Sequence, residues 1–205
     1  MENFTQQGPG ASNEELILVS AKSAAEICGR YELGPAAKKF LRDDATPRQF
    51  LGVLIEKEQY LDAVRFLSFA LPKKEAVQWA CLCARHILRV QATARESESL
   101  RAAERWVMDP SDDNRRAAMA AAEKEGLGSP AGCAALAAFL SGGSLAPTSV
   151  ATVPPGEHLT AQVAAGAIML AAVIVEPEKA PEKYRVFLAH GLDLAKGLKP
   201  RSDSR

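Results

Sequence analysis

The sequence has few aromatic residues and almost none of the alternating β-branched runs that are typical of strands. Aromatic side chains make up 6% of the 205 residues. Because a half-buried strand alternates apolar and polar residues, the lack of such runs argues against a β-sheet. Alanine, the best helix former, is instead the commonest residue, with 37 copies. We therefore predict an all-α protein.

An excess of charge of either sign is also missing. The 25 basic and 25 acidic residues give a formal net charge of zero. Nucleic-acid-binding proteins usually carry a basic excess or a basic stripe along one element, and the sequence shows neither. We therefore predict no nucleic-acid partner. The hydrophobic fraction of 47% and the charged fraction of 24% are typical of a soluble globular protein.

The motifs of the common enzyme classes do not occur: there is no G-x-S-x-G, Walker A, Rossmann glycine pattern or H-E-x-x-H. The glutamates are scattered along helix-forming segments, which is more typical of a solvated surface than of an acid–base pair. The adjacent Arg115 and Arg116 are able to bind an anion, but an exposed ion pair with Asp112 is the commoner arrangement. We assign no catalytic or cofactor-binding residue.

The four cysteines lie in apolar helical contexts, where a free cysteine packs as a small hydrophobic side chain. Cys81 and Cys83, followed by His86, suggest a metal-ligand spacing. On a helix, however, residues two apart point about 200° apart, so only Cys83 and His86 share a face. A structural zinc ion needs four ligands, and a nucleophilic cysteine needs an exposed, electropositive setting. We predict neither site, and we expect reduced thiols and a cytoplasmic location.

A secretion signal is not recognisable, because the N-terminus has neither its basic nor its apolar region. The longest apolar run covers residues 161–175, whereas a membrane span needs about 20 residues. It ends in the charged sequence Glu-Pro-Glu-Lys. We predict a buried helix in which Gly166 allows a neighbouring helix to approach closely. Attachment to a membrane through this run is the alternative.

What the sequence does contain is a long apolar-periodic region, residues 46–88, which predicts three consecutive helices. Thr46-Pro47 is a helix start signal, and Leu71-Pro72 ends the second helix. The predicted core face of the second helix is Leu61, Val64, Leu67 and Leu71. The third helix, near residues 73–89, carries two apolar stripes, one with Val77, Ala80, Cys81, Ala84 and Leu88 and the other with Trp79, Cys83, His86 and Val90. Since a surface helix needs only one stripe, we predict that this helix is the centre of the core.

The remaining segments complete an irregular multi-helix bundle of about eight to ten helices. We expect disordered tails at residues 1–15 and 199–205 and one helical domain over residues 16–198. Helix starts are predicted at Asp109-Pro110, at Ser129-Pro130 and at Pro181. The polar stretch that follows Leu88 is compatible with either an exposed helix or a loop.

The longest irregular stretch, residues 144–157, has the sequence SLAPTSVATVPPGE. Connections of this length are uncommon in compact domains. Its prolines predict an extended, polyproline-like path over the surface. Such a segment either spans the distance between two helices, which is the commoner case, or binds a partner protein. The candidate partner-binding residues are Thr148, Val150, Val153, Pro154 and Pro155.

Several short motifs carry a family resemblance. They are Ala25-Glu26-x-Cys28, Thr46-Pro47-x-x-Phe50-Leu51, Asp62-Ala63-Val64-Arg65-Phe66-Leu67 and Ala70-Leu71-Pro72-x-Lys74-Glu75-Ala76-Val77-x-Trp79-Ala80-Cys81. These motifs resemble a family of uncharacterised helical bacterial proteins that is linked to type VI secretion loci. The resemblance implies a bacterial accessory protein.

Together with the missing motifs, this resemblance leads us to expect a non-enzymatic interaction protein. An adaptor or chaperone whose partner is a secretion effector or a secretion component would fit. The alternative is an enzyme whose site is assembled from unrelated helices. A deep polar pocket that holds titratable groups with shifted pKa values would favour the enzyme.

Overall fold

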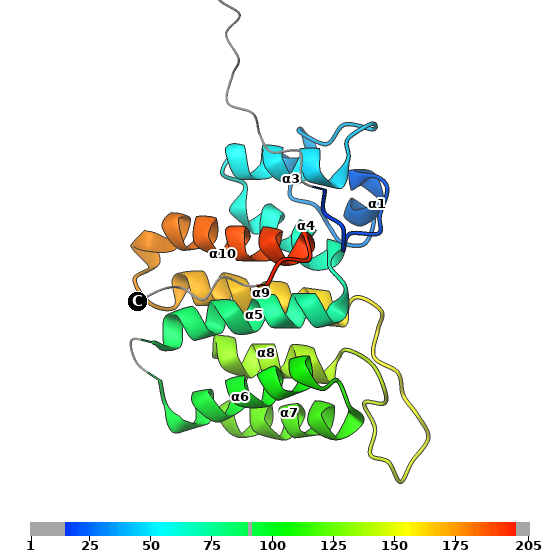
Figure 1. The fold of residues 1–205 in the computed structure, drawn as a ribbon, viewed down its shortest axis with the longest axis vertical. Helices are drawn as coiled ribbons and strands as arrows, with labels where there is room; N and C mark the ends of the chain where they lie inside the picture. The colour runs from blue at the N-terminus through cyan, green and yellow to red at the C-terminus, as the bar shows by residue number, and fades with distance from the viewer. Residues whose placement is uncertain (1–14, 90–91, 200–205) are drawn as a thin grey trace, which may run out of the picture.

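The computed structural model describes residues 15–89 and 92–199, and in these ranges the secondary structure is entirely helical. The helices are α1 (Ala24–Cys28), α2 (Pro35–Lys38), α3 (Pro47–Glu56), α4 (Tyr60–Ala70), α5 (Lys73–Leu88), α6 (Ala94–Met108), α7 (Asp112–Glu125), α8 (Pro130–Phe139), α9 (Leu159–Val173), the 3-10 turn η1 (Pro177–Lys179) and α10 (Ala180–Ala195). They stack in rows, with α1 and α3 at one end and α6 and α7 at the other (Figure 1). The all-α prediction is confirmed. Apart from Glu15 and Lys199, the predicted tails lie outside the described residues, as does Val90.

Side-chain caps define several helix starts. The Thr46 hydroxyl oxygen accepts a hydrogen bond from the Gln49 backbone amide at the start of α3, and the Gln49 side-chain oxygen accepts one from the Thr46 backbone amide. Thr93 and Glu96 form the same capping box, so the polar stretch after Leu88 contains the first turns of α6. The predicted start at Asp109-Pro110 is two residues early. Ser111 caps α7 instead, because its hydroxyl oxygen accepts from the Asn114 amide.

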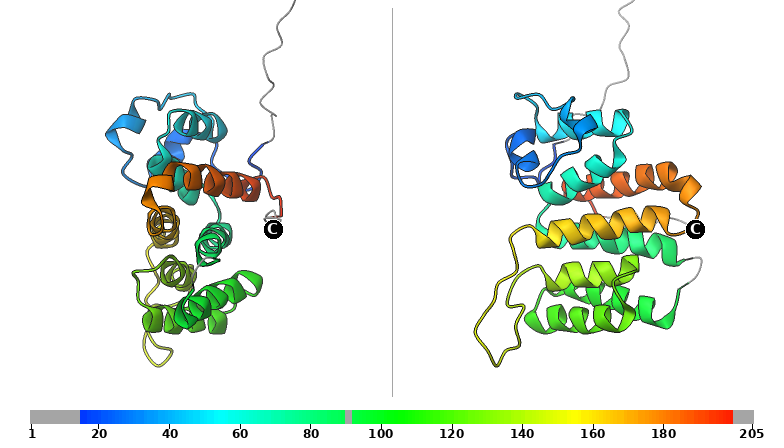
Figure 2. Two further views of the ribbon diagram at one scale, coloured as in Figure 1. Left: turned by 90° about the vertical axis from the view of Figure 1, so that its left-hand side faces the viewer. Right: turned by 180° about the vertical axis from the view of Figure 1, so that it is seen from behind.

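Helix α5 lies at the centre of the bundle and packs against α6, α8, α9 and α10 (Figures 1 and 2). Trp79 is fully buried, and its indole Nε1 donates a 2.7 Å hydrogen bond to the Phe187 carbonyl of α10. Val77, on the other predicted stripe, is fully buried as well. The prediction of a central helix with two buried faces is therefore confirmed, although Leu88 is only half-buried.

The core face of α4 is wider than predicted. Leu61 is 48% exposed, whereas the aromatic residues Tyr60, Phe66 and Phe69 are buried. The reason is that α4 packs against α3, α9 and α10, so only a narrow strip of it reaches solvent. A face chosen from aliphatic spacing alone included Leu61 and missed the aromatic residues.

Close helix approach occurs at Gly191, and the prediction of close approach at Gly166 is wrong. A Cβ at Gly191 would lie 2.7 Å from Leu67 Cδ2 and 2.7 Å from Trp79 Cε2, so only glycine lets α10 pack here. Gly166 is exposed, and a Cβ there would have no heavy atom within 4 Å. The apolar composition of α9 predicted burial on every side, whereas the helix is open to solvent at Gly166.

The apolar run 161–175 ends on the surface. Helix α9 stops at Val173, and residues 173–175 are exposed. The buried Lys183 amine donates to the carbonyls of Ala172, Val175 and Glu176, so a cation satisfies the orphan carbonyls at this helix end. Among the described helices, none is long and apolar enough to cross a membrane alone. Helix α9 and the η1–α10 segment reach that length and apolar character only when taken together, and the two are bent by 115° relative to each other.

Candidate functional site: the connector and its arginine anchor

Residues 144–157, which we call the connector, join α8 to α9 without helix or strand. The connector projects beyond the ends of α7 and α8 (Figures 1 and 2). Of the candidate binding residues, Thr148, Val150, Val153 and Pro154 are exposed, with Val150 at 58% and Val153 at 49%, and Pro155 is half-buried. The structure therefore brings these residues together on the surface of one segment.

The predicted extended path is wrong, because the connector folds back on itself. The Leu145 amide donates a 2.8 Å hydrogen bond to the Val153 carbonyl. The Ser144 hydroxyl oxygen accepts from the amides of Ala146 and Val153, at 3.1 Å and 3.0 Å. The two bonds to Val153 join residues eight and nine apart, and they close the loop at a neck formed by residues 144–146 and Val153. They also provide local partners for backbone groups that an extended path would leave to water.

Two arginines of α7 hold the neck. Arg115 Nη2 donates to the Ser144 carbonyl at 3.0 Å, and Arg116 Nη1 donates to the Ala146 carbonyl at 3.3 Å. Both side chains also pair with Asp112, through Arg115 Nε and Arg116 Nε at 2.8 Å. The predicted pairing with Asp112 is confirmed, but its expected exposure is wrong for Arg115, which is 3% exposed. The sequence identified the two arginines as an anion-binding or ion-pairing site. Nothing in their spacing indicated that they would donate to carbonyls 29 and 30 residues away.

Arg115 is buried because it also joins α7 to α8. Its Nη1 donates to the Phe139 carbonyl at 2.9 Å, and its guanidinium carbon lies 4.7 Å from the centre of the Phe139 ring. Gly143, just before the connector, has a φ of +63°, and a Cβ there would lie 2.9 Å from the guanidinium. Glycine at this position therefore satisfies both the left-handed backbone and the close approach.

The carboxylate that orients both arginines is itself exposed. Hydrogen bonds from Arg116 and then Arg115 lower the pKa of Asp112 below its ordinary value of 3.8. The carboxylate is therefore ionised at neutral pH. The anchor of the connector consists of Asp112, Arg115 and Arg116.

The cysteine and histidine positions are arranged for packing. Burial raises the pKa of Cys81 and Cys83 well above the ordinary thiol value, which disfavours the reactive thiolate. His86 contacts the Phe187 ring edge-on, at 5.5 Å between ring centres. Over residues 15–89 and 92–199, no group of three or more His, Cys, Asp or Glu side chains is placed to hold a metal ion.

Two hollows bear on the enzyme alternative. The larger, about 770 Å³, lies between the segment 15–21 and the start of α3 and has Leu16, Ile17 and Leu51 among its lining residues. The second hollow, about 480 Å³, has Tyr31 and Arg65 among its lining residues. Burial is the largest cause that raises the pKa of Tyr31. This shift makes Tyr31 a weaker acid and does not place it near the pH at which an acid–base catalyst works.

Comparison with protein-family models supplies the relationship of this chain to others. One model, described as a family of unknown function (DUF6931), matches residues 50–195. The chain belongs to DUF6931. The match begins inside α3, ends with the last residue of α10 and includes the connector and its anchor. No curated protein and no solved structure matches the chain significantly.

Proposed function

We propose that this DUF6931 protein is a non-enzymatic interaction protein that binds a partner protein through the connector. The observation that carries the proposal is an exposed, uncharged loop tip on a firmly held neck. Between Ser144 and Gly156 the connector has no charged residue, and Val150 and Val153 are exposed. Exposed apolar residues on a pre-ordered loop favour binding, because less conformational entropy is lost when the partner is engaged.

The anchor supports this interpretation over that of a simple connection between helices. Asp112, Arg115 and Arg116 form ion pairs and hydrogen bonds that fix the neck. A connection that only spans two helix ends requires no buried arginine, and burying a cation is costly unless it is fully hydrogen-bonded. The fixed neck is typical of a loop whose tip must be presented in one position.

The family resemblance gives the proposal its biological setting. The proposed protein is a bacterial, cytoplasmic adaptor or chaperone, and its partner is an effector or another component of a type VI secretion system. Such a role needs a binding surface and no catalytic group.

Site-specific photo-cross-linking in the native host tests this function. A photoreactive amino acid replaces Val150, and the control variant carries it at Leu61, a similarly exposed apolar residue on α4. We expect one discrete cross-linked protein from position 150 that the control does not give. No cross-linked protein from position 150, or equal products from both positions, would refute the proposal, as would robust turnover of a metabolite by the purified protein.

A further inference from the structure

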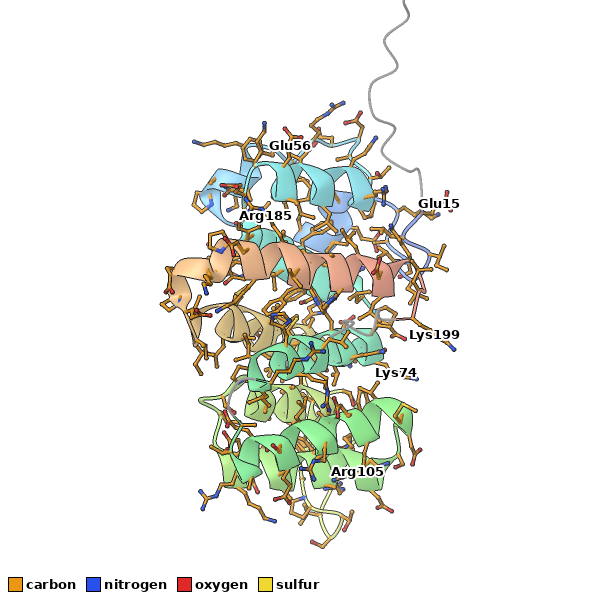
Figure 3. All side chains as sticks on the ribbon, turned by 60° about the vertical axis from the view of Figure 1, so that its left-hand side comes forward. Glu15, Glu56, Lys74, Arg105, Arg185 and Lys199 are labelled. Atoms are coloured by element: carbon orange, nitrogen blue, oxygen red, sulfur yellow. The ribbon has the colours of Figure 1, made fainter. Side chains whose placement is uncertain are left out.

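A basic face covers the outer sides of α5 and α6, although the chain as a whole is neutral. It consists of Lys73, Lys74 and Arg85 from α5, Arg89 directly after α5, and Arg101 and Arg105 from α6. Figure 3 labels Lys74 at the start of α5 and Arg105 on the neighbouring helix α6. The basic face could not be recognised from the sequence, because its residues come from two different helices.

Two of the three acidic side chains near this face are paired with arginines. Three shallow hollows along α5 and α6 are lined by seven basic residues and by three acidic ones, Glu104, Asp109 and Asp112. Glu104 pairs with Arg85, and Asp112 pairs with Arg115 and Arg116. Asp109 accepts hydrogen bonds from Ser111 and Asn114. Basic side chains therefore outnumber acidic ones among the residues that line these hollows.

Within the described ranges, Arg101 and Arg105 form no ion pair. They lie four residues apart, and Met108 follows three residues later, so the three side chains share one face of α6. Met108 is 84% exposed, the highest value among the large hydrophobic residues that the structure describes. All three residues line one open hollow. The face thus combines two free guanidinium groups with one exposed, adaptable apolar side chain.

We propose that the basic face binds an acidic segment of a partner protein, a segment that carries an apolar side chain for Met108. Charge complementarity identifies the partner, because two unpaired arginines select for carboxylates. Nucleic acid is disfavoured, since a phosphate backbone offers no apolar group to cover Met108. The hollow that contains Lys73 and Lys74 also contains Ser141, Gly142 and Gly143, which lead into the connector. This proposal rests on the proposed function only in that one partner would contact both the connector and the basic face.

The probe for this test is a fluorescently labelled peptide of about 15 residues in which glutamates surround two leucines one helical turn apart. A second peptide has serines in place of the leucines, and a single-stranded oligonucleotide of equal charge completes the set. Fluorescence anisotropy at low salt measures the affinity of the full-length protein for each. Because screening strengthens with ionic strength, affinity for the acidic peptides should fall steeply as salt is added.

We expect Arg101→Glu with Arg105→Glu to weaken binding of the leucine peptide by about tenfold or more, since two attractive charges become repulsive. The matched control is Lys38→Glu with Lys39→Glu, which makes the same change of charge at two exposed positions at the end of α2 and should leave affinity unchanged. Met108→Ser should weaken binding of the leucine peptide and leave the serine peptide unaffected. Far-UV circular dichroism verifies that each variant is folded.

Three results would overturn the proposal. The first is no binding of the leucine peptide, or equal binding by the Arg101→Glu/Arg105→Glu and Lys38→Glu/Lys39→Glu variants. The second is tighter binding of the oligonucleotide, lost in the arginine variant. The third is self-association at low salt that the arginine variant abolishes, which would make a second copy the occupant. Each leaves the cross-link from position 150 unaffected, so failure here is distinguishable from failure of the proposed function.

Discussion

The indole nitrogen of Trp79 donates a 2.7 Å hydrogen bond to the backbone carbonyl of Phe187, which lies 108 residues further along the chain. This bond joins the central helix α5 to the last helix α10. Both side chains are fully buried. The contact therefore couples the first third of the family-matched region to its end.

Replacing Trp79 with alanine should lower the free energy of unfolding by about 2–5 kcal/mol, and Leu67→Ala should do the same, because each change leaves a cavity in the core. Chemical denaturation measures both values. Leu61→Ala, at an exposed position of the same helix as Leu67, is the control and should change stability by less than about 0.5 kcal/mol. Changes that small at Trp79 would mean that α5 is not the centre of the core.

Two glycine substitutions should have effects of opposite sign. Gly191→Ala places a methyl group 2.7 Å from Leu67 and Trp79, and such overpacking costs about 1–3 kcal/mol. Gly166→Ala adds a methyl group to an open helix surface and should stabilise the protein by about 0.5–1 kcal/mol through helix propensity. Thermal or chemical unfolding of the two variants distinguishes them. Stabilisation by Gly191→Ala would contradict the packing of α10.

These two glycines show what sequence can and cannot predict. Periodicity located α5 and its two buried stripes, because an apolar pattern reports how many sides of a helix are covered. It could not tell which glycine lies at a helix crossing, since that depends on which helices become neighbours. The same limit applies to the candidate site. The connector was visible as a gap in periodicity, but its closed neck and the arginines that hold it come from residues distant in sequence.

The anchor should give stability a characteristic pH dependence. The pKa of Asp112 is lowered below 3.8 in the folded protein, so its pairing stabilises the fold above that pH and is lost as the pH falls below it. Asp112→Asn should therefore destabilise the protein at neutral pH, and the difference from wild type should shrink in acid. Asp113→Asn, an exposed neighbour in the same helical turn, controls for the helix dipole. Equal pH profiles for the two variants would contradict the role of Asp112.

Thiol labelling tests the packing interpretation of the cysteines. Cys81 and Cys83 are buried, and burial raises their pKa, so iodoacetamide should modify them only after unfolding. Cys28 and Cys133 are half-buried and should react slowly in the folded protein, ahead of the other two. Mass spectrometry of labelled peptides in buffer and in denaturant gives the order. Rapid labelling of Cys83 in the folded protein would revive the hypothesis of a reactive cysteine.

The central claim, that the connector binds the partner protein, is tested most directly by replacing residues 148–153 with a Gly/Ser linker of equal length. The anchor residues and the neck position Ser144 stay in place, and unfolding of the variant verifies that the fold is intact. The measurement is the affinity of the variant for the protein identified by cross-linking at position 150. Our account predicts a large loss of affinity, because the exposed apolar side chains of Val150 and Val153 are gone. Unchanged affinity with an intact fold would show that the connector only joins α8 to α9.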